Sequence, residues 1–202
     1  YINGELLTSA NITATRINDW AFYNCTSLTN ITLSDNLEYV GTNSFVKTSL
    51  VGSVYDNAYY IGTPSNPYKI LLRATSKNIT SIRLHENTEI VSGYAFSGCS
   101  SLEEVQLNEK LTKIGYSSFE HCSALRELFI PSSVKVFSAM ILGEYRREEP
   151  ITFIFETNYG WCKSSTEENS TLTDANINNM FEERISQELM QNMQQYWYIC
   201  IK

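Results

Sequence analysis

A repeated segment constrains this chain more than any other feature of its sequence. Phe96 and Phe119 are 23 residues apart, and so are Phe22 and Phe45. A cysteine follows three of these phenylalanines by three residues and a leucine by six, in the segments 21–28, 95–102 and 118–125. A fixed period of this length is typical of solenoid proteins, in which each repeat forms one turn of a coil.

Each repeat also contains a strand pattern. Leu102, Val105 and Leu107 follow the second of these segments, and the residues 23 positions later are again apolar: Leu125, Leu128 and Ile130. Apolar residues two positions apart indicate a strand with one buried face. Because one such strand cannot bury its face alone, the sequence predicts stacked parallel strands about 4.8 Å apart.

The same step of 23 residues predicts where the coil ends. It carries Leu128 and Ile130 onto Ile151 and Phe153, so Ile151–Phe155 is expected to be the last strand of the stack. About six turns result. The flanking consensus is missing from this last turn.

The period is broken once. Phe45 and Phe96 are 51 residues apart, 28 more than one period. The surplus falls at about residues 51–78, which are rich in tyrosine. Within it, Tyr59–Gly62 and Lys69–Ala74 predict two strands around a turn with proline and asparagine. We expect a hairpin that either projects from the coil or extends it.

The run Ala-Phe-x-x-Cys-x-Ser-Leu, with the Ile-Gly pair before the next Phe, resembles the BspA-type leucine-rich repeats of bacterial and some protist surface proteins. The resemblance covers about residues 12–155, and residues 60–72 resemble an inter-repeat segment of that family. It implies a β-rich leucine-rich-repeat solenoid and a binding or adhesion role at a cell surface or outside the cell. Thr48, in place of the cysteine, and residues 1–16, which fit the period poorly, depart from the pattern.

The composition changes after Gly143. Residues 144–202 contain ten acidic and five basic residues, so −5 of the net charge of −7 lies there. We expect residues 1–143 to form the solenoid and 144–202 to add its last turn and an α/β cap. The cap would comprise a loop over Asn158–Thr173, a final strand over Tyr196–Ile201, and between them a helix whose apolar face contains Ile177, Phe181, Ile185 and Leu189.

Motifs for catalysis are sparse. The sequence has no P-loop, dinucleotide, zinc-protease, Cys-x-x-Cys or nucleophile-elbow motif. His121 beside Cys122 suggests an enzyme, but a cysteine on an inward bend is expected to be buried and unreactive. We therefore expect no catalytic activity, no cofactor and no metal. The acidic balance argues against nucleic acid, and no long apolar stretch predicts membrane insertion.

The outward positions of the strands are the predicted binding surface. Phe129 is an aromatic side chain in a solvent-facing position, so it either packs against the cap or contacts a partner. His85 is expected to be solvated at a strand end. The candidate binding residues are Thr32, Arg83, His85, Gln106 and Phe129 on the strands and Tyr59, Tyr60 and Tyr68 in the insert. The expected partner is a protein or host-matrix macromolecule, and a purely structural spacer is the alternative.

The sequence alone does not decide two covalent modifications, a disulfide bond and glycosylation. Cys162 and Cys200 both lie in the expected cap and could pair, whereas Cys99 and Cys122 are expected to stay reduced. Five N-x-[ST] sequons would carry glycan only in a secreted eukaryotic chain. In a bacterial chain they have no such role.

Overall fold

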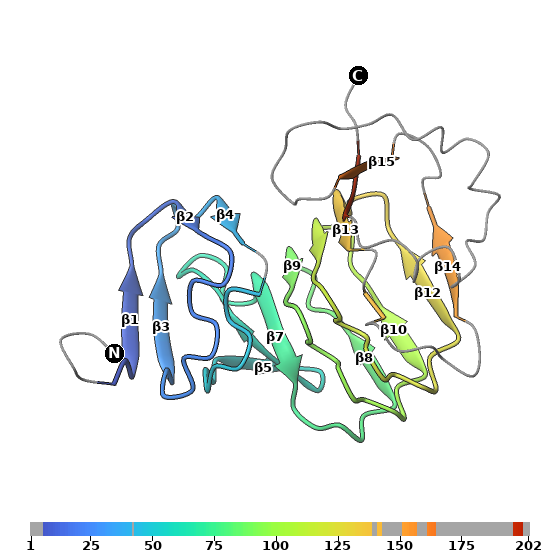
Figure 1. Cartoon of the computed structure of the whole chain (residues 1–202), viewed down its shortest axis with the longest axis horizontal. Coiled ribbons are helices and arrows are strands. Elements are labelled where there is room, and N and C mark those ends of the chain that lie inside the picture. Colours follow the sequence, from blue (N-terminus) through green and yellow to red (C-terminus); the bar gives the residue numbers. More distant parts are fainter. Residues whose placement is uncertain are drawn as a thin grey trace.

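The computed structural model describes residues 6–41, 43–138, 141–142, 151–156, 161–164 and 196–199. They form a coil of about six turns whose strands stack in two columns (Figure 1). The first column contains β1 (Ser9–Ile12), β3 (Asn30–Leu33), β8 (Ser81–Arg83), β10 (Glu104–Gln106), β12 (Glu127–Ile130) and β14 (Thr152–Phe155). The second contains β2 (Arg16–Ile17), β4 (Tyr39–Val40), β9 (Ile90–Val91), β11 (Lys113–Ile114) and β13 (Val136–Ser138). The predicted leucine-rich-repeat solenoid is therefore confirmed.

The first column tolerates changes in the repeat step. Ser9 pairs with Asn30, a step of 21 residues, whereas Arg16 in the second column pairs with Tyr39 at the regular 23. The shorter step between β1 and β3 explains why the first residues fit the period poorly. The strand pair β2–β4 in the second column thus keeps the 23-residue step, whereas the pair β1–β3 in the first column has a step of 21 residues.

The predicted register of the last strand is wrong by two residues. Leu128 pairs with Phe153 and Ile130 with Phe155, in place of Ile151 and Phe153. Because side chains alternate between the two faces of a strand, a shift of two residues keeps the same side chains inward. Ile151 and Phe153 are accordingly both buried, and β14 is the last strand of the first column as expected.

The turns after β2, β4, β9 and β11 repeat one backbone conformation. Residues two before and two after the core phenylalanine have positive φ angles: Trp20, Asn43, Tyr94 and Ser117 before it, and Asn24, Lys47, Gly98 and His121 after it. Neighbouring turns are joined by backbone hydrogen bonds, from Phe22 N to Ser44 O at 2.9 Å and from Phe96 N to Ser118 O at 2.8 Å. The aromatic rings stack within each pair of turns, Phe22 on Phe45 and Phe96 on Phe119.

The insert extends the coil. It forms three antiparallel strands, β5 (Ser53–Tyr55), β6 (Ala58–Ile61) and β7 (Ile70–Ala74), and β7 pairs in parallel with β9. Of these, β5 was not expected. Asp56 and Asn57, both at positive φ, make the two-residue turn between β5 and β6. Their side chains cover the edge of β8, where Asp56 accepts from the Arg83 N–H and Asn57 donates to the Ser81 carbonyl.

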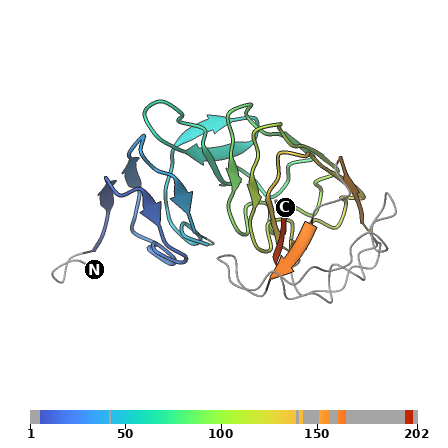
Figure 2. The same cartoon turned by 90° about the horizontal axis from the view of Figure 1, so that it is seen from above.

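The two faces of the insert belong to two different cores. Tyr60 and Leu71 pack into the cluster that continues to Phe153, whereas Ile70 and Leu72 pack into the cluster that begins at Ile17. Figure 2 shows these strands, in cyan, between the N-terminal and C-terminal halves of the coil. A strand buried on both faces requires consecutive apolar residues, which explains the run Ile70-Leu71-Leu72.

Two polar contacts join the N-terminal half to the rest of the chain. Lys113 on β11 is only 8% exposed and donates to the Val40 carbonyl on β4 at 2.8 Å. The carboxylate of Asp35 accepts two hydrogen bonds from Ser65 in the insert, from its N–H at 3.0 Å and its hydroxyl at 2.6 Å. Both contacts link residues that are at least 30 positions apart in the sequence.

Two further strands, β15 (Trp161–Ser164) and β16 (Tyr196–Ile199), lie in the C-terminal region. β16 pairs antiparallel with both β13 and β15, so it closes the edge of the second column as a cap should. The expectation of a loop over Asn158–Thr173 is wrong at β15, because the partner strand β16 offers its backbone groups there. The helix expected around 177–189 and Cys200 lie outside the described residues.

The Asp35 contact predicts a pH-dependent stability. Hydrogen bonds from Ser65 and Thr63 hold the pKa of Asp35 below its ordinary value. A lowered pKa in the folded state stabilises the protein above the ordinary pKa, and this contribution is lost as the pH falls through the folded value. Asp35→Asn should therefore lower the urea midpoint at about pH 6, with a difference from wild type that shrinks toward about pH 2.

The control is Glu103→Gln, which removes an exposed carboxylate on another turn. It should leave the urea midpoint unchanged throughout this range. An Asp35→Asn deficit that stays constant with pH would contradict the role assigned to the carboxylate charge.

Candidate binding surfaces

The outward face of the first column is largely as the sequence predicts. Arg83, Gln106 and Phe129 are exposed, while Ile82 and Leu128 beside them are buried. Arg83 lies opposite Gln106 in the pairing of β8 with β10, and β12 with Phe129 contacts β10 on its other side. The three side chains thus form one row across three turns, which we call the Arg83–Phe129 row.

Phe129 is the exposed aromatic residue of this row. Its side chain is 47% exposed, although its strand is paired on the far side with β14. An aromatic ring left in solvent at this level offers apolar area to a partner. Thr32 is also exposed but lies on β3, in the half of the coil that precedes the insert, so the structure does not bring it into the row.

The expectation that His85 is solvated is wrong. Its ring stacks on Tyr68 with centroids 3.8 Å apart, and the edge of Tyr55 meets it at 4.9 Å. Its Nδ1 accepts a hydrogen bond from the Asn87 N–H at 3.1 Å. Both tyrosines belong to the insert, and His85 follows β8 of the coil. Their ring contacts therefore hold the insert against the coil.

The candidate tyrosines of the insert occupy different environments. Tyr60 is 0% exposed and belongs to the core, where burial raises the pKa of its hydroxyl, so it is not available on the surface. Tyr68 is half-buried beneath His85. Tyr59 is half-buried with the Arg73 guanidinium 5.0 Å above its ring. The alternation of β6 explains why neighbouring tyrosines face opposite sides.

The cysteines of the repeat point inward, as predicted. Cys99 and Cys122 are buried free thiols, and Cys25 is a half-buried one. The Cys122 thiol donates to the Phe96 carbonyl at 3.2 Å, and burial raises the pKa of Cys99. His121 is exposed on the opposite side of the backbone from Cys122, so the adjacent pair is divided between surface and core. Thr48 replaces the thiol with a hydroxyl that donates to the Phe45 carbonyl.

The described residues contain neither a cluster of metal ligands nor a helix suited to span a membrane. Within the ranges that the structure covers, no three His, Cys, Asp or Glu side chains gather in a way that could hold a metal ion. Over the same residues, no helix has the length and apolar character to cross a bilayer.

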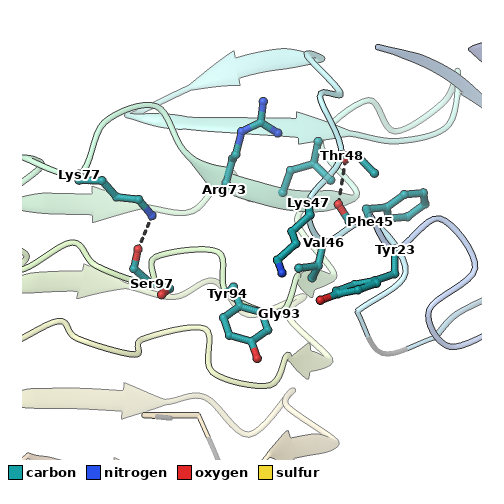
Figure 3. Close-up of a pocket in the computed structure, with 11 residues that line it drawn as sticks. Tyr23, Phe45, Val46, Lys47, Thr48, Arg73, Lys77, Gly93, Tyr94 and Ser97 are labelled. Atoms are coloured by element: carbon teal, nitrogen blue, oxygen red, sulfur yellow. Dashed lines mark hydrogen bonds between the residues drawn. The ribbon is translucent and has the colours of Figure 1, made fainter. Parts of the chain in front are cut away.

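The structure adds one site that sequence reasoning missed. A cleft of about 350 Å³ opens between the turn at 45–48, strand β7 and the turn at 93–97. Its lining includes three cationic side chains and two tyrosines, Lys47, Arg73, Lys77, Tyr23 and Tyr94 (Figure 3). We call it the cationic cleft. Its residues come from four separate parts of the chain, at residue 23 and at 45–48, 72–77 and 93–97, so no local motif could have indicated it.

Comparison with known proteins agrees with the geometry. The family model of the BspA type Leucine rich repeat region matches in six copies, over residues 3–63 and 74–196. The chain belongs to this family. The gap between the two matched ranges, at 64–73, falls inside the insert, between β6 and the end of β7. No curated protein matches the chain.

Several solved bacterial structures are similar to this BspA-type chain. A leucine-rich repeat protein from Bacteroides ovatus is 24% identical, with a TM-score of 0.30 over 75% of this chain and 30% of its own. The pneumococcal vaccine antigen PcpA is 20% identical, with a TM-score of 0.38 over 63% of this chain and 40% of its own. A leucine rich cell surface protein from Faecalibacterium prausnitzii is 17% identical, with a TM-score of 0.31 over 64% and 49%. The chain thus spans less than half the length of each.

Thiol labelling tests the structural role assigned to the repeat cysteines. With iodoacetamide under native conditions, we expect Cys25 to be modified first and Cys99 and Cys122 to stay unmodified, because buried thiols are shielded and poorly ionised. Peptide mass spectrometry identifies the labelled sites. Labelling in urea is the control and should modify all three. Rapid native labelling of Cys122 would contradict the assignment and favour an enzymatic thiol.

Proposed function

We propose that this chain is a non-catalytic binding module of a secreted or cell-surface protein, and that it recognises a macromolecule through the exposed face of its first strand column. The observation that carries this proposal is the Arg83–Phe129 row. Arginine and aromatic side chains are enriched among the residues that contribute most to protein interfaces. Here they lie on adjacent strands of the first column, with β10 between β8 and β12.

The geometry of the row suits a large partner better than a small one. Successive parallel strands stand about 4.8 Å apart, so the row crosses three turns of a continuous surface. Stable recognition of a protein uses about 800 Å² on each partner, which a solenoid face supplies by repetition. A protein or host-matrix macromolecule is therefore the proposed partner.

Location is part of the same proposal. The Faecalibacterium structure is described as a leucine rich cell surface protein. The chain also belongs to the BspA-type leucine-rich-repeat family. These two points support an extracellular or cell-surface setting for this chain.

The test begins with an array of purified extracellular-matrix proteins and glycans, followed by affinity measurement on each hit. Arg83→Ala and Phe129→Ala should each weaken binding about tenfold, about 1.4 kcal/mol, because both remove exposed contact groups. Both positions are exposed, so the fold should be retained. Unchanged affinity in the double variant would refute the sheet face as the binding surface.

Matched controls are available on other surfaces. Val54 on β5 is an exposed apolar residue, and Lys110 is an exposed cation in the turn after β10. Val54→Ala and Lys110→Ala should leave affinity unchanged. If no array component binds, the structural-spacer alternative is favoured.

A further inference from the structure

The cationic cleft lies away from the proposed binding face. Its walls are the turns that follow second-column strands β4 and β9, together with β7 of the insert. Backbone hydrogen bonds join the turn at 22–24 to that at 44–46, and the turn at 94–98 to that at 116–120. The cleft opens between these two pairs, where the insert separates the halves of the coil.

The cleft concentrates positive charge in an acidic protein. Lys47, Arg73 and Lys77 line it, and its lining contains no carboxylate. Among the described residues, none of these cations forms a salt bridge: Lys47 lies 5.4 Å from the Tyr23 ring, Arg73 lies over Tyr59, and Lys77 donates to the Ser97 carbonyl. Because these partners are neutral groups, the three positive charges are not compensated by them and can attract an anion.

One acidic group contacts a residue of the cleft lining. Glu120, on the neighbouring turn, accepts a hydrogen bond from the Ser97 hydroxyl at 3.2 Å. Glu120 is not among the lining residues. Burial, with Tyr116 and Glu120 nearby, raises the pKa of Tyr94, so this carboxylate lies beside the cleft at Ser97 and Tyr94. The lining itself carries three cations.

Two of the lining residues occupy left-handed backbone positions. Lys47 and Tyr94 both have φ of +58°, and the equivalent residues of other turns also have positive φ: Asn24, Gly98 and His121 for Lys47, and Trp20, Asn43 and Ser117 for Tyr94. Left-handed backbone favours glycine and asparagine, although this repeated turn also holds larger residues there. The repeated turn therefore fixes the backbone that carries Lys47 and Tyr94 into the cleft lining.

The tyrosines give the cleft a second recognition element. Figure 3 shows the Tyr23 and Tyr94 rings side by side at one end, with the Lys47 amine directed toward them. The cleft volume of about 350 Å³ lies in the range of small-ligand sites and accommodates a group of the size of one sugar ring. The C–H faces of a pyranose suit the electron-rich face of an aromatic ring.

We propose that the cationic cleft binds an acidic saccharide. A sugar ring packs on Tyr23 or Tyr94, and its carboxylate or sulfate interacts with the cations that line the cleft, Lys47, Arg73 and Lys77. Arginine and lysine form charge-assisted hydrogen bonds to both anions. This site is separate from the Arg83–Phe129 row, and the proposal does not depend on the function of that row.

Isothermal titration of the intact chain tests the ligand class. The probes are a hyaluronan tetrasaccharide, which carries carboxylates, a heparin tetrasaccharide, which also carries sulfates, and neutral chitotetraose. Hexaglutamate and inorganic sulfate test whether any acidic peptide or simple anion suffices. We expect at least one acidic tetrasaccharide to bind, with an affinity that falls at high salt, and chitotetraose not to bind. The two acidic probes distinguish carboxylate from sulfate recognition.

Variants test the location. Lys47→Asn removes the amine and installs the residue that Asn24 provides in the equivalent turn, so the left-handed backbone is preserved. Lys47→Asn and Lys77→Gln should each lower affinity at least fivefold, and Tyr23→Leu should do the same by removing the ring. The matched control is Lys110→Gln, which removes an exposed amine outside the cleft and should change nothing. Thermal melting confirms that each variant is folded.

Several results would overturn the proposal. Absence of binding by both acidic tetrasaccharides refutes it, as does equal binding of hexaglutamate or of sulfate alone. Equal loss in Lys110→Gln indicates charge attraction without a site. The Arg83→Ala/Phe129→Ala variant should retain full saccharide binding, so failure of the sheet-face function and failure of the cleft are recorded by different measurements.

Discussion

The structure depends on one constraint, which is that a single turn of the coil cannot cover its own apolar face. Each inward leucine, isoleucine and phenylalanine is buried only when the neighbouring turn supplies the other side, as the stacked rings of Phe96 and Phe119 show at 5.1 Å. The backbone hydrogen bonds between turns follow the same repetition. Any interruption of the stack therefore leaves two open surfaces that must be closed in another way.

The insert provides that closure. Its strands bury Tyr60 and Leu71 against one half and Ile70 and Leu72 against the other, so each half gains the neighbour that the repeat would have supplied. The edge of β8 is covered by the Asp56–Asn57 turn, and Lys113 satisfies the Val40 carbonyl on the other half. Where the turns themselves separate, the cationic cleft remains. The same interruption that required new packing thus left an open cleft lined by three cations.

The Arg83–Phe129 row and the cationic cleft have different physical origins. The Arg83–Phe129 row arises from the repeat itself, because equivalent outward positions on β8, β10 and β12 fall next to one another. The cationic cleft arises from the break in the repeat, which places Lys47 of the turn before the insert in one cleft with Arg73 and Lys77 of the insert. The net charge of −7 describes neither surface, since −5 of it belongs to residues 144–202.

The sequence alone determined the repeat, the strand faces and the buried cysteines, because periodicity in side-chain character is a local property that stacking preserves. It also placed Arg83, Gln106 and Phe129 outward. Tertiary structure decided the rest. The step between β12 and β14 changed by two residues, His85 became part of an aromatic stack, and Tyr60 entered the core. These outcomes depend on how the insert packs against the coil. Contacts between distant segments leave no periodic signal, so only the folded chain shows them.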